Sequence, residues 1–237
     1  SRTAGTVSRA QNGKPYPYFY GYKTAGIFQN MDEVAAYINK DGGMIQPNAV
    51  PGDVRFVDMN GDGKITTDDC TDIGKGMPDW TYGLNFNVSW KNFDFSMQWT
   101  GAWNVDRMLS EFRRPLGDTN SKALLLYQYE TTWRSSEDTF TAKFPRASNS
   151  HASNNYRGTD LYLINASYLR LKNVEIGYNF DFPFMKKMKL DNCRLYINGY
   201  NLLTITGFDW GDPESRQSDR PNYPLTRVFN IGLKVGF

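Results

Sequence analysis

Residues 80–101 read WTYGLNFNVSWKNFDFSMQWTG, and this stretch decides the fold class. Apolar residues alternate with polar or small ones on both sides of the dipeptide Lys91-Asn92, which is the period of a β-strand with two different faces. Asparagine tolerates the positive φ that a two-residue hairpin turn requires, so we interpret the dipeptide as the turn. An antiparallel hairpin closed in this way pairs apolar with apolar residues along one face. The expected pairs are Trp90 with Phe93, Val88 with Phe95 and Phe86 with Met97.

Three further strands are predicted at about 166–180, 193–203 and 226–237. In the last of them, apolar residues again occupy every second position. These residues are Phe229, Ile231, Leu233, Val235 and Phe237. The strand at 166–180 changes phase near Lys172-Asn173. That change predicts either a β-bulge or, in a membrane protein, an upper strand end that stands clear of the bilayer.

The composition narrows the class of protein. Aromatic residues make up 15% of the 237 residues, whereas the mean hydropathy is only −0.60. No apolar run approaches the roughly 20 residues of a membrane-spanning helix, but strands that alternate lipid-facing and lumen-facing residues keep a polar average. The charges nearly balance, with Lys+Arg 27 against Asp+Glu 25, so nothing points to nucleic acid as a partner. These features fit a transmembrane barrel or a soluble all-β protein.

The lengths of the connections favour the barrel. Long segments at 1–79, 102–165 and 204–225 alternate with short ones at 91–92 and 181–191. Outer-membrane barrels have long extracellular loops and short periplasmic turns. A periplasmic C-terminus then places all three long segments outside the cell.

The chain is therefore expected to be all-β and to form, over residues 1–237, the C-terminal part of a large transmembrane antiparallel β-barrel. Residues 1–79 are expected to be an extracellular loop, and residues 80–237 to supply about five strands with long outer loops. Short helices are expected inside the loops, at 31–39 and 121–133. Transmembrane barrels start at about eight strands, and an open edge in lipid leaves backbone groups unpaired. We therefore expect further strands, from the N-terminal remainder of the same barrel.

Residues 58–69 read DMNGDGKITTDD, which follows the calcium-loop pattern D-x-[DN]-x-[DN]-G with an acid at the twelfth position. The predicted ligands are the side chains of Asp58, Asn60, Asp62 and Asp69 and the backbone carbonyl of Lys64. Three carboxylates this close in sequence repel one another unless a cation lies between them. The pattern therefore predicts a structural Ca²⁺ site. The alternative is an Asx- and Gly-rich turn without a metal.

Six segments match, in order, the motifs of one protein family. They are FYGYKTAGIFQNMDEV (19–34), PGDVRFVDMNGDGKITTDD (51–69), IGKGMPDWTYGLNFNVSWKNFDFSM (73–97), SYLRLKNVEIGY (167–178), NLLTITGFDWGDPES (201–215) and YPLTRVFNIGLKVGF (223–237). With these segments the chain resembles the C-terminal region of SusC/RagA-type TonB-dependent outer-membrane transporters of Bacteroidetes. The resemblance is weakest at 104–160, where the family varies most and where substrate specificity is expected.

The resemblance implies a location, an activity and partners. Transporters of this type form barrels of about 22 strands with a plugged lumen in the bacterial outer membrane, and they import oligosaccharides or peptides. The expected partners are a SusD-like surface lipoprotein, outer-membrane lipid, the rest of the same barrel, and the TonB complex, which acts through a plug that this chain is expected to lack. The alternative function is a calcium-stabilised extracellular glycan-binding module without a transport role.

Few residues suggest substrate contact or catalysis. Trp103, Trp133 and Trp210 are substrate-binding candidates, because flat aromatic faces can stack on sugar rings. The competing interpretation is that they anchor the protein at the membrane interface or pack their own loops. The single histidine, His151, and the acids of Asp212-Pro213-Glu214 have no catalytic partner in the sequence. No enzyme motif is found, so no enzymatic activity is expected.

Overall fold

The computed structural model describes residues 2–3, 8–109, 126–135, 142–148, 154–183, 190–209, 211–215 and 225–236. The chain divides into two compact units. The first unit contains residues 1–77, 106–164 and 218–220, and the second contains residues 78–105, 165–217 and 221–237. The described residues within 106–164, which belong to the outer loop expected at 102–165, therefore pack with the N-terminal residues.

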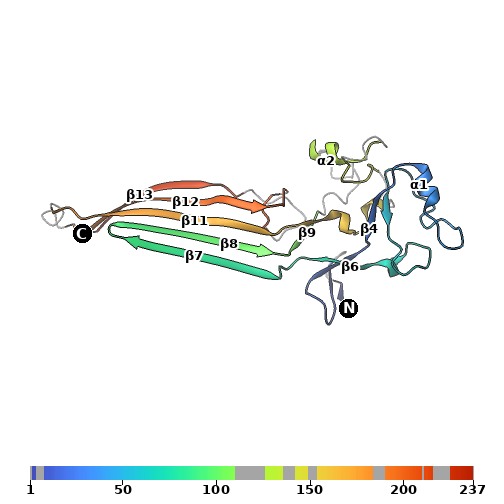
Figure 1. Cartoon of the computed structure of the whole chain (residues 1–237), viewed down its shortest axis with the longest axis horizontal. Coiled ribbons are helices and arrows are strands. Elements are labelled where there is room, and N and C mark those ends of the chain that lie inside the picture. The colour runs from blue at the N-terminus through green and yellow to red at the C-terminus, as the bar shows by residue number, and fades with distance from the viewer. Residues whose placement is uncertain are drawn as a thin grey trace. The chain divides into compact units, whose positions relative to one another are not determined.

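The second unit is built on one five-stranded antiparallel sheet (Figure 1). Its strands are β7 (Trp80–Trp90), β8 (Phe93–Trp103), β11 (Tyr168–Phe180), β12 (Asn192–Thr206) and β13 (Val228–Gly236). Their spatial order is β13-β12-β11-β8-β7. All the predicted strands are present, and the prediction of an all-β chain is confirmed.

The hairpin of β7 and β8 has the predicted register. Trp90 pairs with Phe93, Val88 with Phe95 and Phe86 with Met97. One detail differs from the prediction. The residue with positive φ in the two-residue turn is Lys91, at 53°, and not Asn92. A positive φ at the first turn residue suffices for one of the two tight hairpin turns, so the asparagine was not the residue that the turn required.

The phase change in β11 is a bulge. The pairing of β11 with both β8 and β12 shifts register between Leu171 and Asn173. On either side of the shift, Leu171 pairs with Trp99 and Val174 with Met97. The shift therefore returns the apolar residues of β11 to the same face of the sheet, which decides between the two interpretations of the sequence.

The first unit contains short strands and short helices. One sheet joins β1 (Arg2–Thr3), β2 (Ser8–Ala10), β3 (Tyr18–Gly21) and β6 (Thr71–Lys75), a second joins β4 (Thr24–Ile27) to β5 (Val54–Phe56), and a third joins β9 (Asp106–Met108) to β10 (Leu163–Asn165). The α-helices are α1 (Met31–Ala36) and α2 (Leu126–Thr131), and 3₁₀ turns lie at Thr67–Asp69, Asn154–Tyr156 and Asp160–Tyr162. The interpretation of residues 1–79 as a loop with one helix missed β1 to β6, because strands this short show no period.

Apolar side chains give the first unit a small core. Phe28, Val34 and Ala49 are buried together, and Tyr37 packs against them. The helix α1 presents Val34 to this core, and the Asn30 side chain caps it by accepting a hydrogen bond from the Glu33 backbone N–H at 2.8 Å. No helix among the described residues is long and apolar enough to cross a bilayer.

Candidate functional site

The five-stranded sheet has one face that is apolar in every strand, which we call the apolar face. Cross-strand pairing places these side chains in continuous rows, for example Ile176 opposite Ile197 and Ile197 opposite Ile231. The large exposed members are Trp80, Tyr82, Leu84, Phe86, Val88, Trp90, Phe93, Trp103, Ile176, Leu195, Ile197, Leu203, Ile205, Phe229, Ile231, Leu233 and Val235. Ile231 is 75% exposed. An exposed apolar surface of this extent marks contact with a partner or a membrane, and a band of outward apolar side chains is how a transmembrane barrel meets lipid.

The opposite face, which we call the polar face, carries amides and charged groups. Its members include Asn85, Asn87, Asp94, Gln98, Arg170, Asn173, Glu175, Arg194, Asn198 and Asn230. Such groups are costly in hydrocarbon and are typical of a barrel interior. The alternation predicted from residues 80–101 therefore continues across all five strands.

An arginine ties three strands of the polar face together. Arg194 of β12 donates hydrogen bonds to Glu175 of β11, at 2.7 Å, and from Nε to Asp94 of β8, at 3.1 Å. Its Nη2 also pairs with Asp94. The side chain reaches β8 by passing over Gly177, where a Cβ atom would lie only 2.6 Å from Nε of Arg194 and from Oδ2 of Asp94. A glycine at this position is therefore what allows the ion pairs to form.

The same network continues to the last strand. Asn198 donates to Glu175 at 3.3 Å, and Asn230 of β13 donates to Asn198 at 2.9 Å. Hydrogen bonds between side chains thus run from β8 to β13 along the polar face. They add to the backbone pairing of the sheet and hold the charged side chains in fixed positions.

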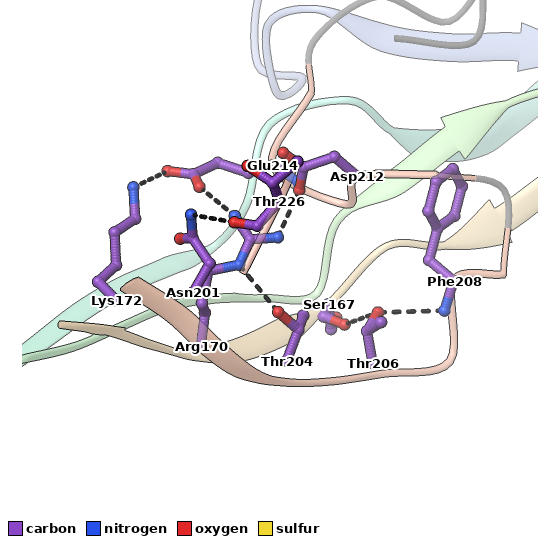
Figure 2. Close-up of polar contacts among 10 residues, drawn as sticks. All are labelled: Ser167, Arg170, Lys172, Asn201, Thr204, Thr206, Phe208, Asp212, Glu214 and Thr226. Atoms are coloured by element: carbon purple, nitrogen blue, oxygen red, sulfur yellow. Dashed lines mark hydrogen bonds and ion pairs between the residues drawn. The ribbon is translucent and has the colours of Figure 1, made fainter. Parts of the chain in front are cut away.

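A second arginine, Arg170 of β11, is almost fully buried, with 2% of its surface exposed. Figure 2 shows it between Asp212, Glu214 and Thr204, at 2.5 Å from Asp212, 2.7 Å from Glu214 and 3.0 Å from the Thr204 hydroxyl. Lys172 also pairs with Glu214, at 3.0 Å. A buried guanidinium without partners would cost several kcal/mol, and here two carboxylates compensate it. These contacts fasten the segment after β12 to β11.

The two acids of Asp212-Pro213-Glu214 are thus ion-pair partners of Arg170. The sequence analysis singled out the acids but not the arginine. The signal that could have identified Arg170 was its place at an inward position of a strand, where an unpaired cation is rare.

The calcium-type loop is a tight turn in the first unit. The carboxylate of Asp58 accepts the backbone N–H groups of Gly61, at 2.7 Å, and Gly63, at 2.8 Å. Gly63 has a φ of 81°, a conformation in which glycine is strongly favoured, as the motif predicts. Asp62 accepts the Lys64 N–H at 2.9 Å. The loop therefore already closes through its own hydrogen bonds.

Asp69, the twelfth residue of the motif, is fully buried under this loop. Its carboxylate accepts the backbone N–H groups of Met59, at 2.9 Å, and Thr66, at 2.7 Å, with a longer bond from Asn60. Burial raises the pKa of this carboxyl, but the backbone N–H groups of Thr66, Met59 and Asn60 more than offset that effect and leave the pKa below its usual value. Asp69 therefore stays ionised at neutral pH.

The motif's five oxygen-bearing residues lie within one turn of chain, at 58–69. Within the described residues, no cluster of three or more His, Cys, Asp or Glu side chains is arranged to hold a metal ion. Two of the predicted ligands, the Asn60 side chain and the backbone carbonyl of Lys64, are not among these four kinds of side chain. Amide and carbonyl oxygens are nevertheless ordinary Ca²⁺ ligands.

The tryptophan candidates lie in different places. Trp103 ends β8 on the apolar face opposite Trp80, a position suited to an interface anchor. Trp133 donates from Nε1 to Gln29 at 2.8 Å, and its ring lies against Gly52, so it packs within the first unit. Trp210 and His151 lie outside the described residues.

Comparison with known proteins identifies relatives along almost the whole chain. TonB-dependent receptor P3 of Formosa agariphila is 31% identical over 245 residues, a match that covers 96% of this chain and 23% of the receptor. TonB-dependent receptor SusC of Bacteroides thetaiotaomicron is 26% identical over 98% of this chain and 21% of its own length. No family model matches the chain.

A solved structure has the same fold. The structure of the RagAB peptide importer in the open-open state superposes with a TM-score of 0.70 and 20% identity, and the match covers all of this chain and 24% of that one. The chain thus spans about a quarter of the length of the relatives that it matches. Receptors of this type are outer-membrane proteins. In sequence and in fold, the chain is similar to SusC/RagA-type TonB-dependent receptors of the outer membrane, as its motifs predict.

Proposed function

We propose that this chain forms part of the wall of an outer-membrane importer, with the apolar face against lipid and the polar face lining the lumen. The observation that carries the proposal is the register of the five strands, which gathers large apolar side chains on one face from β7 to β13 and places the charged and amide side chains on the other. A polar face opposite an apolar one is the arrangement of a barrel wall that separates lipid from a polar lumen.

The importer takes up oligosaccharides or peptides together with a SusD-like lipoprotein, and it is energised by the TonB complex. Two of the comparisons support this proposal. One sequence relative is named SusC, and a solved structure of the same fold is that of a peptide importer. The plug and the remaining strands come from parts of the relatives that this chain does not match. No catalytic step is assigned to the residues of this chain.

The test is uptake by cells that lack the full-length gene. Deletion should abolish uptake of at least one radiolabelled oligosaccharide or peptide mixture, and an uncoupler of the inner-membrane proton gradient should abolish it in the wild type. Affinity purification in detergent should recover a surface lipoprotein with the transporter. Uptake that persists in the deletion strain for every solute tested, or that ignores the uncoupler, would contradict the proposal.

A second proposal concerns the loop at 58–69, which we propose holds one structural Ca²⁺. Asp58, Asn60, Asp62, Asp69 and the Lys64 carbonyl would hold the ion, which would neutralise three carboxylates within twelve residues. The burial of an ionised Asp69 supports the proposal, since buried carboxylates are usually paired with a cation. The competing account is the self-closed turn described above.

Calorimetric titration of the chelator-treated full-length protein with CaCl₂ separates the two accounts. The wild type should bind with a dissociation constant on the order of 10⁻⁴–10⁻³ M, and Asp62→Ala should lose the binding. The neighbouring Asp68→Asn is the control, because Asp68 is exposed and is not a predicted ligand. Absence of Ca²⁺ binding by the wild type would leave the self-closed turn as the explanation.

A further inference from the structure

Three tyrosines at alternate positions lie in β3 or directly after it, in the first unit. Tyr18 and Tyr20 belong to the strand, and Tyr22 follows it and pairs with Thr159 in an isolated bridge. Side chains two residues apart in an extended chain point to the same side, and the rings of Tyr18 and Tyr20 lie 6.3 Å apart. The three rings therefore form a row, which we call the tyrosine row.

Two rings of the tyrosine row each carry an arginine. The Cζ atom of Arg9, from β2, lies 3.5 Å from the centre of the Tyr20 ring. The Cζ atom of Arg157 lies 5.2 Å from the centre of the Tyr22 ring and 5.5 Å from that of the Phe56 ring. The face of an aromatic ring attracts a cation, so the row holds two guanidinium groups on neighbouring rings.

Both guanidinium groups act on one thiol. The register of β3 with β6 continues to Cys70 and places it beside Tyr22. Burial raises the pKa of the Cys70 thiol, and a hydrogen bond with the Tyr22 hydroxyl lowers it in part. The positive charges of Arg9 and Arg157 also lower this pKa. The fold therefore brings two arginines that are distant in sequence close to the same sulfur atom.

A stacked guanidinium presents its N–H groups beyond the edge of the ring. At 3.5 Å, the Cζ atom of Arg9 is in van der Waals contact with the flat ring of Tyr20, so the guanidinium plane lies along the ring. The N–H donors lie in that plane, in the fork that binds oxyanions. Arg9 and Arg157 are both half-buried, so part of each side chain remains accessible to a ligand.

The carboxylates of the neighbouring segments have other partners. Asp72 of β6 pairs with Lys14 at 3.5 Å. Asp160 accepts hydrogen bonds from the backbone N–H and the hydroxyl of Thr24, at 3.0 and 2.7 Å. Asp69 accepts backbone N–H groups, as described above. These three acids therefore do not neutralise the two arginines.

A tetrahedral oxyanion suits two guanidinium groups better than a carboxylate does. A carboxylate has two oxygens, and the fork of one arginine occupies both. A sulfate or phosphate group offers at least three strong acceptor oxygens, so it can bind both forks at once. We propose that Arg9 and Arg157 form a site for a sulfate or phosphate group. The inference goes beyond the proposed function, because it holds whether the group is a free ion or a substituent of a larger solute.

The test is calorimetric titration of the full-length protein in detergent at constant ionic strength. The ligands are sodium sulfate, sodium phosphate, a sulfated disaccharide, a sugar phosphate and sodium acetate. Sulfate or phosphate should bind with a dissociation constant of about 1 mM or lower, and acetate should bind at least about tenfold more weakly. Tighter binding of the sulfated or phosphorylated sugar than of the free ion identifies a substituent as the source. Equal or weaker binding identifies the free ion.

Substitutions separate the site from a general positive field. Arg9→Gln and Arg157→Gln should each weaken oxyanion binding about tenfold. Arg9→Lys keeps the charge but loses the fork, so it should restore little of the binding. The matched control is Arg55→Gln, which should bind like the wild type. Arg55 belongs to the same unit, donates to the Ala25 carbonyl at 2.7 Å and lies over the ring of Phe28.

The assignment is overturned if the wild type binds neither ion, or if acetate binds as tightly as they do. It is also overturned if Arg9→Gln and Arg157→Gln bind like the wild type, if Arg55→Gln loses as much binding, or if Arg9→Lys binds fully. A second measurement needs no variant. Sodium sulfate should raise the unfolding temperature of the wild type more than sodium chloride of equal ionic strength does, and equal effects of the two salts would overturn the site.

Discussion

Gly177 allows Arg194 to reach across the sheet, and Gly177→Ala is the substitution that tests this contact. The added methyl group would lie 2.6 Å from Nε of Arg194 and from Oδ2 of Asp94. Both atoms belong to the ion-pair network that joins β8, β11 and β12. Because backbone pairs fix Gly177 between Tyr196 and Asp94, the strand cannot move away, and the Arg194 side chain must leave its partners.

The expected loss in the free energy of unfolding of Gly177→Ala has two contributions. Insertion of a methyl group into a packed site costs about 1–3 kcal/mol. Hydrogen bonds to charged groups contribute about 1.5–3 kcal/mol each, and at least one of those that Arg194 makes would be lost. Partial exposure of the network, with Arg194 at 21%, lowers the second term. We expect a total loss of about 2–4 kcal/mol in the free energy of unfolding.

Gly83→Ala is the matched control, because Gly83 lies on the polar face of β7 and its Cβ would meet only the Trp99 carbonyl, at an ordinary 3.6 Å. Alanine in place of glycine at an unstrained position stabilises by about 0.4–1 kcal/mol. Denaturant titration of the full-length variants in detergent micelles gives both values. Equal stability of Gly177→Ala and Gly83→Ala would refute the argument that Gly177 makes room for the network.

Three more outcomes follow from the same structure. Leu233→Lys places a charge on the apolar face and should lower the free energy of unfolding by about 2–4 kcal/mol near the bilayer midplane. Asn87→Lys, on the polar face, should lower it less. Folding titrations into lipid vesicles compare the two variants, and equal losses would contradict the assignment of the two faces. Arg170→Ala leaves two carboxylates without their cation and should cost about 3–5 kcal/mol, and Arg170→Lys should recover little because lysine cannot bind both acids in this geometry; the same titration measures it. The depressed pKa of Asp69 means that its contribution to stability is complete above the ordinary aspartate pKa and is lost as pH falls through the folded value. Limited proteolysis of the loop at 58–69 should therefore increase as pH falls below the ordinary aspartate range, and protection that stays unchanged throughout the acid range would count against the role of Asp69.

Much of the second unit could be predicted because each strand is long and two-faced. The hairpin register followed from the two-residue turn between Trp90 and Phe93 and from the alternation on both sides of it, since a slip by one residue would place every apolar side chain on the wrong face. The bulge in β11 was visible as a break in the same period near Lys172. The turn residue was misassigned, because the sequence preference for asparagine is only statistical and Lys91 adopted the positive φ instead.

The first unit and the ion pairs could not be predicted from periodicity. Strands of two to five residues, such as β1 and β6, are too short to show an alternation. The partners of Arg170 lie more than forty residues away along the chain, and only the fold brings them together.

The central claim is that one face of the sheet meets lipid and the other meets water, and a spin-label scan of β13 tests it most directly. Single labels at residues 228–236 of the full-length protein in outer-membrane lipid vesicles would be probed with oxygen, which partitions into lipid, and with a water-soluble nickel complex. We predict that labels at Phe229, Ile231 and Leu233 are accessible to oxygen, and that labels at Asn230 and Lys234 are accessible to nickel. Accessibility without a two-residue period, or with the opposite phase, would contradict the account.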